Sequence, residues 1–225
     1  MKECKFVSLG PGGKDNVTLG TLKALLDADK IYCFGSNSKS YALDTLLQLE
    51  IPENKICVVE LPMLSDRTKA FEIYTELADR ILQDTGKIIV ATEGDTGIFA
   101  TTHYVMDIMN AKGINVIQTP GIPSFIAAGA LAGISLVSQE QRLLVVPGEI
   151  SNEEMISQLS SGSTIVIMKL SRMKDQMHDF IKQNPNYSYH YVEKVGMPEA
   201  NHITDTEILK EKGFPYFSLM IIKNQ

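Results

Sequence analysis

The residues best suited to ligand binding begin with a glycine cluster near the start of the chain. Residues 10–13 read Gly-Pro-Gly-Gly and follow a short apolar run. Glycine lets the backbone turn sharply and approach a ligand closely, while proline stiffens the turn. A dinucleotide fingerprint would need a third glycine at Asp15, and a Walker A loop would need glycine at Ser8. The cluster is therefore a different ligand loop or a plain strand-to-helix turn.

A second cluster, residues 92–97, reads Thr-Glu-Gly-Asp-Thr-Gly and also follows an apolar run. Carboxylates beside glycines at the carboxyl end of a strand lie where open α/β sheets bind ligands. Asp95 is thus a candidate to hydrogen-bond a ribose or an amine, or else to cap the next helix. Glu93 is expected to be a solvated neighbour.

Three further segments combine breakers or basic residues with strand-like runs. Residues 120–125 read Pro-Gly-Ile-Pro-Ser-Phe, residues 168–172 read Met-Lys-Leu-Ser-Arg, and residues 193–198 read Glu-Lys-Val-Gly-Met-Pro. A hinge, a buried strand with a solvated basic end, and a strand end explain them without any ligand. None of these segments is specific when taken alone.

Metal and redox chemistry find little support in the sequence. Cys4, Cys33 and Cys57 are widely spaced, form no C-x-x-C pair, and are expected to be buried free thiols. The four histidines show no metal-ligand spacing, so no protein-bound metal is expected.

Composition is that of an ordinary globular protein. The 225 residues are 44% hydrophobic and 21% charged, and the formal net charge of −6 argues against general nucleic-acid binding. A local basic patch could still bind a small anionic ligand. No apolar run approaches the ~20 residues of a membrane span, and no signal segment is recognisable, so a cytoplasmic location is expected.

The elements that must position these loops alternate in the first half of the chain. Strand-like runs at residues 5–9, 30–34, 56–61 and 87–92 are followed in three cases by helical stretches at 19–28, 67–83 and 98–111. The last stretch places Ile98, Thr102 and Val105 on one helical face. This alternation predicts a mainly parallel sheet with helices on both faces.

The second half changes character after a further strand at 115–119. A helix is expected at 124–131, with Ser124 at its start. Strands are expected at 143–146, 164–170, 187–194, 202–203 and 217–223, with helices only at 152–159 and 174–183. Such a run of strands predicts a mixed sheet. We therefore expect two α/β domains, residues 1–119 and 120–225, joined at the Pro-Gly-Ile-Pro hinge.

Together, and in this order, the glycine clusters resemble those of the tetrapyrrole methylase family. The family's G-P-G loop after the first strand corresponds to residues 10–12, its G-D-P-x-x-Y loop to residues 94–99, and its P-G-I-S-S-F hinge to residues 120–125. Residues 61–67, 166–172 and 192–199 resemble the branch that methylates carbon 20 of precorrin-2. Gly13 and Lys14 replace the family's Asp and Pro, and Thr96 and Phe99 replace its Pro and Tyr.

The resemblance implies a two-domain enzyme that binds S-adenosylmethionine in a cleft between its domains. It also implies a homodimer that acts in cobalamin biosynthesis on precorrin-2 or cobalt-precorrin-2. The cofactor-binding residues would be Pro11, Gly94, Asp95, Ile98, Ser124 and Met168. No catalytic base is identified.

The substrate implied by the resemblance carries eight carboxylates, so its pocket should offer cations. The candidates at the predicted loop mouths are Lys14, Arg67, Lys169, Arg172 and Lys194. Arg67 and Arg172 are favoured because guanidinium pairs with carboxylate in a bidentate manner. A solvated surface position remains the alternative for each of the five.

Three other functions stay open at this point. A sister methylase could act on uroporphyrinogen III or on another ring carbon. A non-catalytic S-adenosylmethionine-binding protein would bind the cofactor without turnover. An unrelated α/β protein, in which the glycine clusters are only turns, would bind no cofactor.

Overall fold

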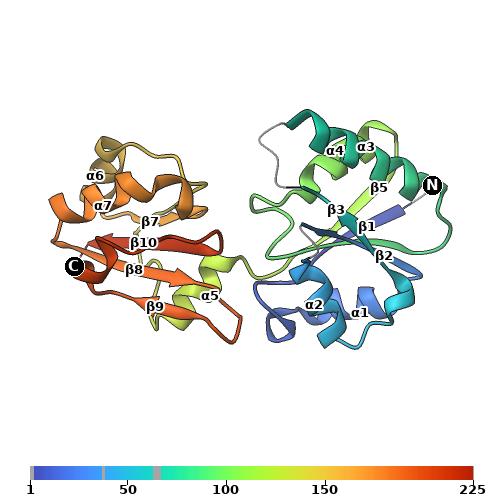
Figure 1. Ribbon diagram of the computed structural model, residues 1–225, viewed down its shortest axis with the longest axis horizontal. Helices are drawn as coiled ribbons and strands as arrows, with labels where there is room; N and C mark the ends of the chain where they lie inside the picture. Colours follow the sequence, from blue (N-terminus) through green and yellow to red (C-terminus); the bar gives the residue numbers. More distant parts are fainter. Residues whose placement is uncertain (1–2, 37–38, 63–66, 225) are drawn as a thin grey trace. The chain divides into compact units, whose positions relative to one another are not determined.

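The chain forms two compact units, Met1–Pro123 and Ser124–Gln225, in a computed structural model that describes residues 3–36, 39–62 and 67–224. Each unit contains one five-stranded sheet covered by helices (Figure 1). The predicted α/β class with two α/β domains is confirmed. The predicted boundary follows Thr119, whereas the compact units divide after Pro123.

The sheet of the first unit is entirely parallel, as the alternation of strands and helices predicts. Its strands lie in the order β3-β2-β4-β1-β5, so that β1 is hydrogen-bonded to both β4 and β5. The strand bounds are β1 Glu3–Ser8, β2 Lys30–Gly35, β3 Ile56–Glu60, β4 Ile88–Thr92 and β5 Asn115–Thr119.

Helices cover both faces of this sheet (Figure 1). Helices α1 (Leu19–Leu26) and α2 (Tyr41–Gln48) bury Leu25 and Leu46 against one face. Helices α3 (Arg67–Gln83) and α4 (Thr102–Ala111) pack in the same way on the other face. Two helices begin with a hydroxyl cap: Thr18 accepts a hydrogen bond from the N–H of Thr21, and Ser40 accepts one from that of Leu43.

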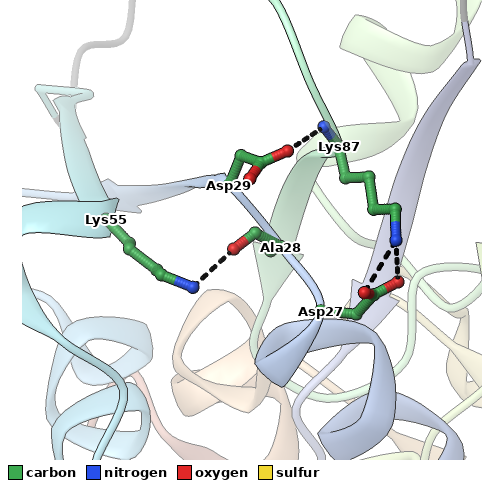
Figure 2. A network of polar contacts seen from close by, with 5 residues as sticks. All are labelled: Asp27, Ala28, Asp29, Lys55 and Lys87. Carbon is green, nitrogen blue, oxygen red and sulfur yellow. Dashed lines mark hydrogen bonds and ion pairs between the residues drawn. The ribbon is translucent and has the colours of Figure 1, made fainter.

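The amino-terminal edge of the first sheet is fixed by a polar network (Figure 2). The Lys87 backbone N–H donates to Asp29 at 2.8 Å, and Lys87 Nζ contacts both carboxylate oxygens of Asp27 at 2.7 and 2.6 Å. Lys55 Nζ donates to the carbonyl of Ala28 at 2.8 Å. The connection from α1 to β2 is thereby attached to the start of β4.

The second unit contains the predicted mixed sheet, in the order β6-β7-β10-β8-β9. Strands β6 and β7 are parallel, and β10 is antiparallel to β7 and β8. Strands β6, β7 and β8 therefore run in one direction and end at the same edge. The bounds are β6 Leu143–Val146, β7 Thr164–Ile167, β8 Tyr187–Glu193, β9 Asn201–Ile203 and β10 Ser218–Asn224.

Helices also pack on both faces of the second sheet (Figure 1). Helices α6 (Asn152–Ser160), α7 (Lys174–Gln183) and the short α8 (Thr206–Leu209) bury Met155, Phe180 and Leu209 on one face. Helix α5 (Ser124–Leu131) contacts β10 from the other face.

Several predicted elements match the structure and others do not. Residues 67–83, 115–119, 124–131, 143–146 and 174–183 have the predicted bounds. The helix predicted from residue 98 is wrong at its start, because α4 begins at Thr102 and Ile98 lies in the preceding turn. Cys4 and Cys33 are buried free thiols as predicted, whereas Cys57 is only half-buried.

Candidate functional site

The two glycine clusters meet at the ends of two neighbouring strands of the first sheet. The connections that follow these strands run to opposite faces of the sheet. Strands β1 and β4 are adjacent and parallel, and their carboxyl ends lie side by side. The chain leaves β1 toward α1 on one face and leaves β4 toward α4 on the other. A crevice opens at such a switch point of an open α/β sheet, and ligands bind there.

Backbone hydrogen bonds join the two clusters beyond the ends of their strands. The N–H of Gly10 donates to the carbonyl of Gly94 at 3.0 Å, and the N–H of Gly94 donates to that of Gly10 at 2.8 Å. Both glycines have left-handed φ, 71° for Gly10 and 70° for Gly94. A Cβ added at Gly94 would meet no atom within 4 Å, so the chain leaves open space beside this pair.

The first loop is closed by Asn16. Its Nδ2 donates to the carbonyl of Pro11 at 2.7 Å, and its backbone N–H donates to that of Gly13 at 3.3 Å. A Cβ at Gly10 would lie 2.4 Å from the Asn16 carbonyl oxygen, so glycine is required there. Pro11 is buried, and Lys14 has an exposed side chain while its backbone N–H donates to Gln48 on α2.

The second loop is organised by Asp95, which is not the N-cap of α4, because Thr101 occupies that position. Its Oδ1 accepts the N–H of Gly97 at 2.8 Å, and its Oδ2 accepts the N–H of Gly121 at 2.7 Å. Buried Ser8 lies beside it, where its hydroxyl donates to the Thr119 carbonyl and accepts the N–H of Thr96, both at 2.9 Å. Asp95 and Ser8 thus attach the loop after β4 to the segment after β5.

Close packing requires glycine at position 121. A Cβ there would lie 2.3 Å from the Ser8 Cβ and 3.0 Å from the Gly94 carbonyl oxygen. Gly121, the second residue of the predicted hinge, is therefore packed tightly against the first unit.

The prediction that Glu93 is a solvated carboxylate is wrong. Its side chain is half-buried and accepts a hydrogen bond of 3.4 Å from the Thr45 hydroxyl on α2. Burial raises the pKa of Glu93 to about 7, although the hydrogen bond from Thr45 acts in the opposite direction. Ser8 and Glu93 were not predicted as site residues, because their partners are distant in sequence. Asn16 was not predicted either, although its partners Pro11 and Gly13 are close in sequence.

The remaining predicted ligand contacts fall on both units. Ile98 is half-buried, and its N–H donates to the Asp95 carbonyl at 3.2 Å. Ser124 is the half-buried first residue of α5. Arg67 is the first residue of α3, and its side chain lies outside the described residues, as do residues 63–66 of the segment before it.

The second unit gathers Met168, Lys169, Arg172 and Lys194 at the carboxyl ends of β7 and β8. Half-buried Met168 directly follows β7, and exposed Lys194 follows β8. Lys169 and Lys194 both have left-handed φ, 54° and 51°. Arg172 lies one turn beyond Lys169 in a 3₁₀ helix and is exposed.

Apart from Arg67 and Ser124, the predicted residues therefore form two groups, one on each unit. The group at the switch point of the first sheet consists of Pro11, Lys14, Gly94, Asp95 and Ile98, and the group at the edge of the second sheet consists of Met168, Lys169, Arg172 and Lys194. Among the described residues, no three His, Cys, Asp or Glu side chains come together as a metal site, and no helix is long and apolar enough to cross a membrane.

The first unit is an open parallel sheet whose two glycine loops pair at its switch point, and comparison with known sequences shows the family of the chain. Residues 4–208 match the family model of the tetrapyrrole (corrin/porphyrin) methylases, and the chain belongs to this family.

Individual relatives match over nearly the whole chain. A probable cobalt-precorrin-2 C(20)-methyltransferase of Methanocaldococcus jannaschii is 26% identical, covering 99% of this chain and 96% of its own. A precorrin-2 C(20)-methyltransferase of a Sinorhizobium species is 25% identical, covering 96% and 93%. The crystal structure of Thermus thermophilus uroporphyrin-III C-methyl transferase, complexed with S-adenyl homocysteine, has the same fold, with a TM-score of 0.70 at 17% identity over 98% of this chain and 97% of that one.

Proposed function

We propose that this tetrapyrrole methylase transfers a methyl group from S-adenosylmethionine to carbon 20 of precorrin-2 or cobalt-precorrin-2, in cobalamin biosynthesis. The observation that carries the proposal is the pair of glycine loops joined at the switch point, with open space beside Gly94. Two relatives with C(20)-methyltransferase names match nearly end to end, which supports this branch of the family.

The residues at the switch point fit the cofactor. Gly94 leaves room for a close approach of the ligand to the backbone, and Pro11 stiffens the facing loop. Ile98, Ser124 and Met168 would add apolar and hydroxyl contacts. Asp95 already accepts two backbone N–H groups, so its role would be mainly to hold the loops in place.

The second unit offers cations for an anionic macrocycle. Lys169, Arg172 and Lys194 lie at one edge of its sheet, and two of them have left-handed backbone conformations that cost roughly 1–2 kcal/mol each. Such strain concentrates at functional sites. Together with Lys14 and Arg67, these residues would bind and orient the substrate carboxylates.

S-adenosylmethionine would supply an electrophilic methyl group on sulfur. The protein would contribute mainly by aligning the reacting carbon within ~3–3.5 Å of that methyl group and by excluding water. Rigid loops suit this task, because small displacements of a bound reactant lower the rate strongly.

The test is anaerobic incubation with S-adenosylmethionine and precorrin-2, with and without cobalt, followed by mass spectrometry. A gain of one methyl mass located at carbon 20 is expected. Methylation of another ring carbon or of uroporphyrinogen III would replace the proposal with a sister activity. Cofactor binding without turnover on any of these rings would indicate a non-catalytic binding protein.

A matched pair of variants tests the location of the cofactor. Gly94→Ala and Gly113→Ala share a left-handed φ (70° and 75°) and open space around the added Cβ, so their backbone strain is similar. Only Gly94 lies at the switch point. Gly94→Ala should weaken S-adenosylhomocysteine binding at least tenfold, and Gly113→Ala should leave it unchanged. Equal effects would place the cofactor elsewhere.

A further inference from the structure

Two aromatic side chains are exposed side by side just before β10. Tyr216 is 57% exposed and Phe217 is 37% exposed. The chain bends at these two residues, so that the centroids of their rings lie 4.9 Å apart, with the ring planes at 86°. Adjacent side chains of a straight strand would point to opposite faces instead. Tyr216 and Phe217 thus form one apolar surface, called here the aromatic corner.

The backbone of the aromatic corner is held by its neighbours. The Ser218 hydroxyl donates to the Pro215 carbonyl at 2.6 Å, and the Phe217 carbonyl accepts the N–H of Lys194 at 2.8 Å. Phe214, two residues before Tyr216, is buried in the core of the second unit. The two rings are therefore exposed on a segment that is attached to the sheet on both sides.

The aromatic corner lies among the basic residues of the second unit. Strand β10 runs between β7 and β8 and is antiparallel to both, so its first residues lie at the edge where β7 and β8 end (Figure 1). Lys169 and Arg172 follow β7 at this edge, and Lys194 follows β8. The rings thus have cations on both sides.

The carboxylate that directly precedes Lys194 is already paired. Glu193 accepts the hydroxyl of Tyr191, and its Oε2 lies 3.3 Å from Lys212 Nζ. This pairing reduces the negative charge next to the aromatic corner. Exposed apolar surface with a polar rim is typical of a binding site.

We propose that the aromatic corner packs against the ring of the tetrapyrrole substrate, while Lys169, Arg172 and Lys194 bind carboxylates at the rim of that ring. The proposal rests on the proposed function, because it takes the substrate from it. A tetrapyrrole is a broad apolar ring with carboxylates around its rim, and aromatic side chains between cations complement both parts. Aromatic rings prefer offset-stacked or edge-to-face contacts with other π systems, and a perpendicular pair of rings can make both.

Steady-state kinetics of the full chain, with precorrin-2 varied at saturating S-adenosylmethionine, test the proposal. Tyr216→Ala should raise the KM for precorrin-2 roughly tenfold and change kcat little, because the ring contact is the same before and during methyl transfer. Tyr216→Phe keeps the ring and should have a KM close to that of the wild type. The calorimetric Kd for S-adenosylhomocysteine should not change in either variant.

Two further variants separate the apolar contact from other effects. Ile208→Ala removes a side chain of similar exposure, 52%, from α8 of the same unit, and should leave the KM unchanged. Arg172→Gln should also raise the KM, but its effect should shrink between about 0.05 and 0.5 M salt, because salt screens charge pairs. The effect of Tyr216→Ala should persist at high salt.

An unchanged KM in Tyr216→Ala overturns the role of the aromatic corner and leaves the proposed function intact. Equal losses of S-adenosylhomocysteine and precorrin-2 binding in this variant also overturn it, because Tyr216 would then support the fold as a whole. If the wild-type protein neither binds nor methylates precorrin-2 or cobalt-precorrin-2, the proposed function fails and this proposal fails with it.

An independent measurement needs no variant. N-acetylimidazole acetylates accessible tyrosine hydroxyls, and peptide mapping identifies each labelled site. Tyr216 should be labelled readily in the free wild-type protein and in the presence of S-adenosylhomocysteine alone. Addition of precorrin-2 together with S-adenosylhomocysteine should protect it. Labelling of Tyr216 that is unaffected by bound precorrin-2 would contradict the proposal.

Discussion

Asp95 accepts the backbone N–H of Gly121 at 2.7 Å, so a side chain just beyond β4 fixes the segment that follows β5. The same carboxylate accepts the N–H of Gly97. Replacement by alanine leaves both donors without this partner and should reduce the free energy of unfolding by about 1–3 kcal/mol. Urea denaturation measures the loss. Asp95→Asn, which keeps one acceptor oxygen, should lose less of the free energy of unfolding. If Asp95→Ala unfolds with the same free energy as the wild type, these hydrogen bonds do not stabilise the fold.

Two glycine-to-alanine substitutions in the first unit should have opposite effects. At Gly121 the added Cβ would overlap the Ser8 Cβ at 2.3 Å, so the backbone must move and stability should fall by about 2 kcal/mol or more. At Gly20, in helix α1, the nearest contact of the added Cβ is 3.6 Å. There alanine should raise stability by up to about 1 kcal/mol through helix propensity. Thermal unfolding of both variants shows whether each substitution raises or lowers stability. A Gly121→Ala variant more stable than the wild type would refute the packing described for the hinge.

The ionised carboxylate of Glu93 should lower the free energy of unfolding at neutral and alkaline pH. Its pKa is raised from 4.5 to about 7 in the folded protein, so the folded state favours the protonated carboxyl. The contribution of Glu93 to the free energy of unfolding is therefore fully present below about pH 4.5 and is lost as pH rises through 7. Glu93→Gln cannot ionise and should gain about 1–3 kcal/mol over the wild type between pH 5 and pH 8. Denaturation at both pH values measures the gain. A constant difference between the two proteins would mean that Glu93 ionises normally.

The three cysteines should differ in reactivity toward a maleimide. Cys4 and Cys33 are buried, and burial raises the pKa of Cys33 to about 11, so little thiolate is available at pH 8. Half-buried Cys57 should react first in the native protein, and all three should react after unfolding. Peptide mapping identifies the labelled site, and early labelling of Cys33 would contradict the structure.

Much of the fold could be predicted from hydrophobic periodicity. The strand at 115–119 and the helix at 67–83 have strong patterns and were located correctly. Helix α2 was not predicted, although α5, which also has eight residues, was located correctly. Ile98 shares the period of α4, but the turn built by Asp95 precedes the helix, and periodicity cannot show where a helix starts.

The candidate site was predictable only where its residue types are distinctive. Glycines and prolines indicated the loops, and the structure places residues 10–13 and 94–97 side by side. The environment of Glu93 was not predictable, because it depends on Thr45, which lies 48 positions earlier in the chain. The role of Ser8 was not predictable for the same reason. Its hydroxyl donates to the carbonyl of Thr119, and that contact exists only because β5 ends beside β1 in the fold.

The position of β1 between β4 and β5 has a consequence for synthesis. Its six residues are made before those of both strand partners, which lie within residues 88–119. Until β4 has been made, β1 has neither neighbour, and β2 and β3 can pair only with each other. Pairing over such distances makes folding slow. Nascent chains that stop before Thr119 should therefore remain open to proteases, and protection should appear abruptly once β5 has emerged from the ribosome.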